Sequence, residues 1–342
     1  MRHLIIIGAI LSSVILFIPT MLVLAFQGNE TEEIVTSAAV QTANTTFTEV
    51  TQEPENATVA VFRTKASVTE ETDFEDYIIG VIASEMPADF SLEALKAQAL
   101  TARTYILKMM LNPTDTNLPE GAIVSDTIMH QVYTNDLELR EKWGNDYDWK
   151  MERISGAVQA TRNQVITYEG APITATFFST SNGYTENSED YWPNAIPYLR
   201  SVESPWDLNS PRYTAEKTIS AQQFYEALGV KLPGDGTVGQ ISARTDSGRV
   251  ATVQINGQTF TGRQIREKLD LDSSDFQWKQ SGNSVVIKTK GWGHGVGMSQ
   301  YGADGMAKDG KNYQEIIKHY YNGVEISSIE PFLEKLTSTA KN

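Results

Sequence analysis

One glutamate in the sequence stands where an acid catalyst is expected. Glu85 closes the apolar run YIIGVIASE and is followed by Met86 and Pro87. If a helix ends here, the unpaired carbonyls of its last turn and its apolar neighbours both disfavour the charged carboxylate. A carboxyl group that keeps its proton near neutral pH can protonate a glycosidic oxygen. A solvated glutamate at a helix end is the alternative that spacing alone leaves open.

A loop downstream offers groups that suit a carbohydrate ligand. Its aromatic residues include Tyr184 and Trp192, and sugar rings stack their apolar faces on such side chains. Polar partners for sugar hydroxyls come from the turn STSNG: Ser179, Thr180 and Asn182. Asp207 is a candidate second carboxylate. The alternative is a loop that folds back and packs its own aromatic rings.

Two basic residues and a histidine complete the candidate set. Lys96 and Arg103, seven residues apart, share one face of a helix and could hold an acidic sugar substituent. A solvated basic face is the alternative. In GWGHGVGMSQYG, alternating glycines permit left-handed or strained backbone around His294. This imidazole could orient Glu85, donate to a sugar, or bond buried carbonyl groups.

Composition excludes several kinds of site. The chain has no cysteine, which removes disulfides, thiolate ligands and thiol nucleophiles. The histidines at 130, 294 and 319 lack the spacing of a zinc-binding helix, so we expect no catalytic metal and no cofactor. The formal net charge of -15 argues against a broad nucleic-acid-binding surface.

The predicted secondary structure places Glu85 at a corner between two helices. A short strand, TVAVFR, leads to Asp73, which can cap a helix that ends near Glu85 because Pro87 blocks its continuation. Ser91 can cap the second helix. The segment APITATFFS alternates like one strand, and a helix is expected around NYQEIIKHYYNG. These patterns indicate an α+β fold of mixed helices and antiparallel strands around a cleft.

The chain of 342 residues divides by composition. Residues 1–26 carry no charge from Leu4 to Phe26, enough for a transmembrane helix across a core of roughly 30 Å, with a cleaved signal peptide as the alternative. Arg2 before the span and NETEE after it place the N-terminus in the cytoplasm and the rest outside. Residues 27–57 are predicted to form a flexible tether, and 58–342 the main domain. Within it, a change of pattern over about 208–290, with a capped helix and a strand meander, predicts an inserted α/β subdomain.

Three long segments together resemble one family. They are IIGVIASEMPADFSLEALKAQALTARTY, FFSTSNGYTENSEDYWPNAIPYLRSVESPWD and GWGHGVGMSQYGADGMAKDGKNYQEIIKHYYNGVEI. In this order they resemble the stage II sporulation protein D family, whose wider membership includes enhancers of a peptidoglycan amidase. The resemblance spans about 59–326 and includes the N-terminal anchor.

The resemblance implies a peptidoglycan lytic transglycosylase. It implies cleavage between N-acetylmuramic acid and N-acetylglucosamine to give 1,6-anhydro ends, during engulfment in sporulation, on strands stripped of stem peptides. The family's motif glutamate falls on Glu85. Shared motif positions in the implied glycan cleft are Lys96, Arg103, Asp207, His294 and Tyr321.

The resemblance also implies partners and a location. The companion amidase is stage II sporulation protein P, a third member is stage II sporulation protein M, and the expected location is the septal or engulfing membrane. Some relatives hold zinc with cysteine and histidine ligands near SDTIMHQVY, where this chain offers only His130, so no structural zinc is expected.

Two other functions remain open from the sequence. A glycan-binding protein that activates the amidase without cutting would need the same aromatic loop and basic residues, but not the carboxyl group of Glu85. A hydrolase using Asp207 as its base would leave reducing ends in place of anhydro ends.

Overall fold

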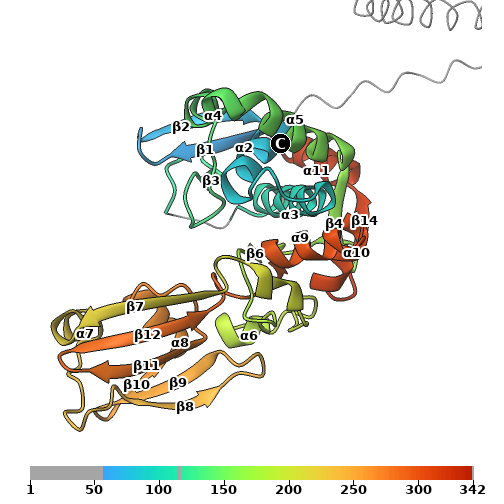
Figure 1. The fold of residues 1–342 in the computed structure, drawn as a ribbon. Coiled ribbons are helices and arrows are strands. Elements are labelled where there is room, and N and C mark those ends of the chain that lie inside the picture. The colour runs from blue at the N-terminus through green and yellow to red at the C-terminus, as the bar shows by residue number, and fades with distance from the viewer. Residues whose placement is uncertain (1–56, 114–116, 341–342) are drawn as a thin grey trace, which may run out of the picture. The chain divides into compact units, whose positions relative to one another are not determined.

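A computed structural model describes residues 57–113 and 117–340 of the chain. The fold is α+β, as predicted, and combines helices with mainly antiparallel strands (Figure 1). The membrane span expected over 1–26 and almost all of the tether expected over 27–57 lie outside the described residues. Within the described part of the chain, no helix is long and apolar enough to cross a membrane.

The chain approaches Glu85 through a hairpin and a capped helix. Strand β1 (Thr58–Arg63) pairs antiparallel with β2 (Val68–Asp73) and parallel with β3 (Val124–Ser125). Helix α2 (Phe74–Glu85) then begins at the predicted cap, where the Asp73 carboxylate accepts hydrogen bonds from the backbone N–H groups of Glu75 and Asp76. Met86 is extended at φ -128° and ψ 136°, because Pro87 disfavours helical geometry in the residue before it. Both predicted ends of this helix are confirmed.

Helix α3 (Leu92–Leu111) lies between two hydrophobic cores. Its predicted apolar face, Leu95, Ala99, Ala102 and Ile106, is fully buried against α2 and α5 (Tyr147–Ala160). A second face, Ala94, Ala97 and Leu100, packs into the other core with α9 (Gln300–Lys308) and α10 (Tyr313–Tyr320). The many alanines let helices approach α3 from both sides.

The second core also contains short strands. Strand β4 (Gln164–Tyr168) pairs with β5 (Ala171–Pro172) and β14 (Glu325–Ser328), whereas β6 (Phe177–Phe178) pairs in parallel with β13 (Met298–Ser299). The sequence predicted a single strand over APITATFFS. That prediction is wrong, because the two halves of the segment pair with different strands. The helix predicted around NYQEIIKHYYNG is confirmed as α10, which has a capping box between Asn312 and Glu315.

The remaining elements outside the insertion are short or terminal. They are α4 (Asp136–Trp143), η1 (Gly144–Asp146), α6 (Ser188–Tyr191), η2 (Pro205–Asn209) and α11 (Glu330–Ala340).

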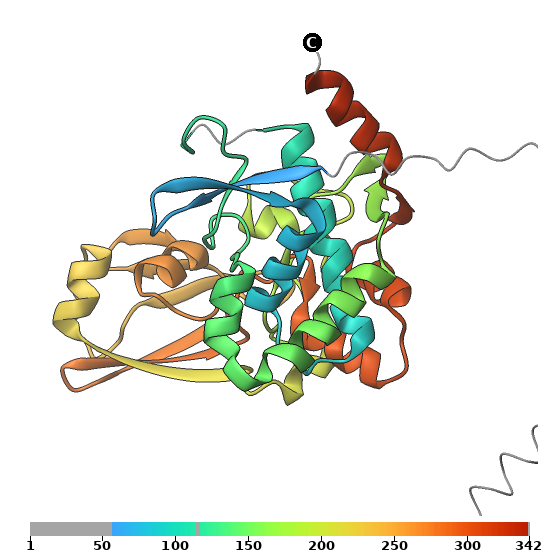
Figure 2. The same ribbon diagram turned by 90° about the horizontal axis from the view of Figure 1, so that it is seen from above.

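The segment 214–290 has a hydrophobic core of its own, which includes Phe224, Val253, Ile265, Phe276 and Val285. Its elements gather together in both views (Figure 2). They are β7 (Thr214–Ser220), α7 (Ala221–Leu228), β8 (Gln240–Arg244), β9 (Val250–Ile255), β10 (Gln258–Thr261), α8 (Gly262–Lys268), β11 (Phe276–Ser281) and β12 (Ser284–Lys290).

These strands form two antiparallel sheets, β10-β9-β8 and β11-β12-β7. The predicted meander is confirmed as β8, β9 and β10, and the predicted helix as α7, capped by Ser220. The first and last strands lie side by side, and Thr214 pairs with Lys290.

Candidate active site

Glu85 is the last residue of α2, and hydrogen bonds hold both its side chain and its backbone carbonyl. Its Oε1 accepts a hydrogen bond of 2.8 Å from the backbone N–H of Val132, and its carbonyl oxygen accepts one of 3.0 Å from the Gln300 side chain. Burial raises the pKa of the carboxyl group above its ordinary value of 4.5, and the Val132 hydrogen bond only partly opposes this. The carboxyl group therefore retains its proton more readily than an exposed glutamate does.

Glu85 lines a pocket of about 580 Å³. The lining comes from the end of α2, one residue of α3, the segment before Val132, the β6 region, the segment between η2 and β7, and the glycine-rich segment with the start of α9. The lining residues other than Glu85 are Ala83, Ser84, Met86, Pro87, Tyr105, Ile128, His130, Gln131, Ala175, Thr176, Phe177, Phe178, Ser179, Arg212, Trp292, Gly293, His294, Gln300 and Tyr301. The three predicted site residues in this pocket are Glu85, Ser179 and His294.

The glycine-rich segment leads into β13 and packs closely against β6 and the residue before it. Gly291, Gly293, Gly295 and Gly297 all have positive φ, as the sequence predicted. A Cβ atom at Gly297 would lie 2.1 Å from the carbonyl oxygen of Thr176, which no side chain permits. Glycine is therefore required there both for its φ of +84° and for the close approach of β6 and β13.

His294 is a neutral imidazole in an aromatic enclosure. Its Nδ1 accepts a hydrogen bond of 3.1 Å from the backbone N–H of Val296, and the rings of Phe178, Tyr191 and Trp192 surround it. Burial, followed by the positive charge of Arg266, lowers the pKa of His294 to about 3. Among the described residues no hydrogen bond joins His294 to Glu85. The imidazole is bonded to backbone groups of Val296 and Phe177.

Asp207 is an interior carboxylate that joins distant segments. It is 0% exposed and accepts hydrogen bonds from the backbone N–H of Ser181 (3.0 Å) and from the hydroxyls of Ser181 (2.8 Å), Ser204 (2.5 Å) and Ser299 (2.6 Å). Burial raises its pKa, against the effect of these donors. Asp207 does not line the pocket of Glu85, but Ser299 caps α9, which carries Gln300.

The predicted basic face of α3 is occupied by structural ion pairs. Arg103 is 0% exposed and binds both carboxylate oxygens of Glu75, at 3.0 and 2.7 Å, and its other donors bond backbone carbonyls, including those of Thr161 and Val158. Lys96 pairs with Glu93 at 2.7 Å. Neither side chain lines the pocket of Glu85. The expectation of a shared, open basic face is therefore not met.

The other predicted residues do not line the pocket. Thr180 is buried, and its hydroxyl lies 2.9 Å from that of Ser210. Asn182 donates to the Ser247 carbonyl in the insertion. Tyr184 is exposed, Trp192 packs against His294, and buried Tyr321 donates to the carbonyl of Thr176.

Several pocket residues were missed by the sequence analysis. Trp292, Gln300 and Tyr301 lie within a quoted motif, so their proximity to His294 was the available signal. Arg212 had no such signal, because its place in the pocket follows from the path of the chain between η2 and β7.

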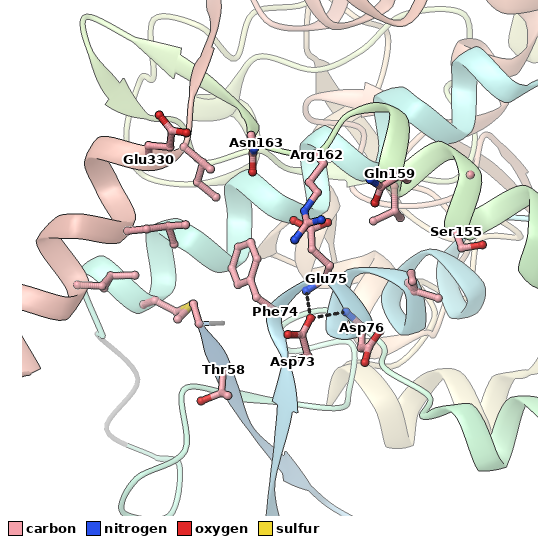
Figure 3. Close-up of a pocket in the computed structure, with 18 of the residues that line it drawn as sticks. Thr58, Asp73, Phe74, Glu75, Asp76, Ser155, Gln159, Arg162, Asn163 and Glu330 are labelled. Carbon is pink, nitrogen blue, oxygen red and sulfur yellow. Dashed lines mark hydrogen bonds between the residues drawn. The ribbon is translucent and has the colours of Figure 1, made fainter. Parts of the chain in front are cut away.

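A second pocket of about 1210 Å³ lies between the first turn of α2, α5 and α11 (Figure 3). Glu75, the partner of Arg103, lines it together with the cap residue Asp73. The carboxylate of Asp73 is thus engaged in capping and that of Glu75 in ion pairing, whereas Asp76, which also lines this pocket, has a pKa raised by burial. Glu85 is not among its lining residues, so we take the smaller pocket as the candidate active site.

No metal-binding cluster is formed by the described residues, where no group of three or more acidic or histidine side chains could hold an ion. His130 lines the pocket of Glu85, and its Nδ1 lies 2.9 Å from the Ser125 hydroxyl.

A partly buried carboxyl group with a raised pKa, in a pocket lined by aromatic rings and close-packed glycine backbone, is suited to acid chemistry on a carbohydrate. A family model described as SpoIID, Stage II sporulation protein, matches residues 62–168. The chain is 49% identical over 330 residues to stage II sporulation protein D of Bacillus subtilis, covering 96% of each chain. It is 50% identical over 325 residues to the protein of the same name from Bacillus amyloliquefaciens, covering 94% of each.

The chain therefore belongs to the stage II sporulation protein D family. It is also 30% identical over 307 residues to a protein named amidase enhancer from Bacillus subtilis, covering 73% of this chain and 40% of that protein.

Proposed function

We propose that this protein is a peptidoglycan lytic transglycosylase that acts in sporulation. It cleaves glycan strands between N-acetylmuramic acid and N-acetylglucosamine, leaves 1,6-anhydro-N-acetylmuramic acid ends, and prefers strands stripped of stem peptides. The observation that carries the proposal is Glu85, a partly buried carboxyl group of raised pKa in a pocket with aromatic walls. Family membership supports the cell-wall context.

In the proposed reaction Glu85 acts first as an acid. The backbone N–H of Val132 occupies Oε1, which leaves Oε2 to carry the proton. That proton passes to the oxygen leaving C1 of the muramic acid residue, and positive charge develops at C1. Loss of the proton makes Glu85 a carboxylate beside this charge.

Glu85 then acts as a base. Its carboxylate removes the proton of the muramic acid C6 hydroxyl, whose oxygen bonds to C1 and closes the anhydro ring. Because the nucleophile belongs to the substrate, one carboxyl group performs both proton transfers, whereas ordinary glycosidases need two. Asp207, buried and outside the pocket, is a poor candidate for the base of a hydrolase.

The pocket supplies the remaining contacts in this proposal. Trp292 is 38% exposed, and the part of its ring that the Arg212 guanidinium does not cover offers an apolar surface to a sugar. Ser179 and Gln300 are polar lining residues suited to sugar hydroxyls. Neutral His294 holds the wall of the pocket in place.

Partners and location are part of the proposal. We place the protein at the septal or engulfing membrane, anchored by residues 1–26, where the amidase stage II sporulation protein P supplies stripped strands and stage II sporulation protein M completes the assembly.

The second candidate function is a non-catalytic activator. Similarity to a protein named amidase enhancer favours a chain that grips glycan and stimulates an amidase. This function needs the pocket but not the ionisable group of Glu85.

The test compares products from the full chain and its Glu85→Gln variant. Stripped glycan strands are incubated with each and analysed by mass spectrometry. We expect anhydro ends with the wild type and a loss of at least about 100-fold with the variant, because general acid catalysis contributes on this scale. Glu152→Gln, an exposed residue that lines the larger pocket, is the matched control and should cut normally.

Each other result has a definite meaning. Intact strands with the wild type, together with stimulation of an amidase, would establish the activator. Reducing ends in place of anhydro ends would show a hydrolase.

A further inference from the structure

Arg212 is an exposed arginine on the wall of the candidate active site. It lies between η2 and β7 and lines the pocket together with Glu85 and Trp292. Its guanidinium carbon lies 4.6 Å from the centre of the Trp292 ring, over the ring itself. The indole thus restrains a positive group at the edge of the pocket without neutralising it.

Among the ion pairs of the described residues, Arg212 takes part in none, whereas Arg103 and Arg63 are both paired with carboxylates. Burial raises the pKa of Asp272 and the positive charge of Arg212 acts to lower it, but the two side chains lie beyond ion-pair distance. No other lysine or arginine of the described chain lines this pocket. The Arg212 guanidinium is therefore the positive group available there to a ligand.

The chemistry of this group selects its ligand. A guanidinium stays protonated at every physiological pH and presents parallel N–H donors that match the two oxygens of a carboxylate. Such charge-assisted, bidentate bonds are about twice as strong as bonds to a neutral acceptor. An amide in the same place offers one carbonyl oxygen and no negative charge.

We propose that Arg212, held by Trp292, forms a subsite for the free carboxylate of the lactyl ether on a muramic acid residue. This inference rests on the proposed function. In peptidoglycan the stem peptide is joined to this carboxyl group by an amide bond, so an amidase that removes the peptide converts a neutral amide into a carboxylate. Arg212 thereby distinguishes strands on which the amidase has acted from strands on which it has not. The preference for stripped strands is then due to this one side chain.

The test varies the ligand and the arginine together. One batch of stripped strands keeps its carboxylates, and a second is converted to the methylamide. We expect the wild type to cut the carboxylate strands at least about tenfold faster, as one charge-assisted bond allows. Arg212→Gln should lose about tenfold on carboxylate strands and nothing on amidated strands, and Arg212→Lys should recover part of the preference.

Arg140→Gln is the matched control. Arg140 is also exposed and lies over an aromatic ring, that of Tyr147, at 4.1 Å, but outside the pocket. Its variant should keep the full preference for carboxylate strands. An unchanged preference in Arg212→Gln, with the thermal stability of the wild type, would overturn the inference while leaving the proposed function intact.

A binding measurement separates this inference from the chemistry of Glu85. Glu85→Gln and the double variant Glu85→Gln with Arg212→Gln are titrated with both kinds of strand. The single variant should bind carboxylate strands about tenfold more tightly, and the double variant should bind both alike. If the wild type cuts nothing yet this difference holds, the proposed function fails and the subsite stands. Equal binding of both strands by the single variant refutes the subsite.

Discussion

At the scale of single residues, the properties of Glu85 follow from burial more than from its place at a helix end. The unpaired carbonyls of the last turn were one expected cause of its raised pKa, but the carbonyl of Glu85 itself is bound by Gln300. Desolvation is the largest contribution. The apolar residues before Glu85 in the sequence therefore provided the better of the two arguments.

The raised pKa of Glu85 makes stability depend on pH. Because the folded state favours the protonated form, the stabilising contribution is complete below about pH 4.5 and is lost as the pH rises through the folded-state pKa. Glu85→Gln cannot ionise and escapes this loss. We expect the variant to melt at a higher temperature than the wild type near about pH 8, and at an equal temperature near about pH 4. Thermal unfolding across this range measures the difference.

Activity gives an independent reading of the same group. The rate of cutting should fall as the pH rises through the raised pKa of Glu85, because only the protonated acid starts the reaction. A melting difference between wild type and Glu85→Gln that is constant from pH 4 to 8 would show that burial does not perturb this carboxyl group.

Arg212 marks the limit of residue-level prediction. Glu85, Ser179 and His294 were found because each lies in a local pattern whose chemistry can be read directly. Arg212 meets Trp292 across 80 residues of sequence, by way of the whole insertion. A pattern of neighbouring residues therefore cannot predict a contact between two residues so far apart in the sequence.

At the scale of elements, α3 explains why the predicted basic face failed. The periodicity of the sequence identified one buried face correctly. Alanines on other faces leave room for a second hydrophobic core, so α3 is enclosed on several sides. Arg103 consequently lies in the interior and binds Glu75 and the last carbonyls of α5. Spacing shows which residues share a face, whereas only the neighbouring helices decide whether that face is open.

This structural role of Arg103 predicts a cost in stability. Arg103→Ala leaves the partly buried Glu75 without its ion-pair partner and removes one of several donors from the carbonyls of Thr161 and Val158, and should cost about 3 kcal/mol in the free energy of unfolding. Chemical denaturation measures this value. Lys96→Ala, which removes a more exposed pair, should cost less than about 1 kcal/mol. Wild-type stability in Arg103→Ala with weakened glycan binding would instead favour the role that the resemblance implies.

The divided strand is a second lesson at this scale. Alternation in APITATFFS correctly indicated extended backbone, but not that β5 and β6 join different sheets. Partners of a strand that come from the far C-terminal segment leave no trace in local periodicity.

At the scale of the whole domain, the insertion supports the wall of the pocket. Arg249, the residue just before β9, is 2% exposed and donates to the carbonyl of Tyr184, with Glu186 at 3.9 Å. Arg266 from α8 donates to the hydroxyl of Tyr191, whose ring packs against His294. The change of pattern near 208 predicted a separate segment, but not that its arginines would reach the aromatic loop.

The substitution Gly295→Ala tests whether the insertion supports the wall of the pocket through Arg249. A Cβ atom there would lie 2.6 Å from the Arg249 guanidinium, at a φ of +88°. Because Arg249 is enclosed, Gly295→Ala should cost about 2 kcal/mol or more and reduce cutting by displacing His294. Gly282→Ala, at a φ of +59° with nothing within 4 Å, is the control and should cost about 1 kcal/mol without affecting cutting. Equal losses in both variants would leave backbone strain as the full explanation.

The antiparallel neighbours β7 and β12 bring the entry and exit of the insertion together, and Gly291 donates a hydrogen bond of 2.8 Å to the carbonyl of Tyr213 just outside them. A gene can gain or lose such a segment as one block, since the chain on either side is already joined at that point. Its acquisition would change the active site in one event, because Arg249 and Arg266 arrive with it and both help to keep His294 uncharged. The paired ends therefore make residues 214–290 a segment that could be added or removed as one block without separating the residues on either side.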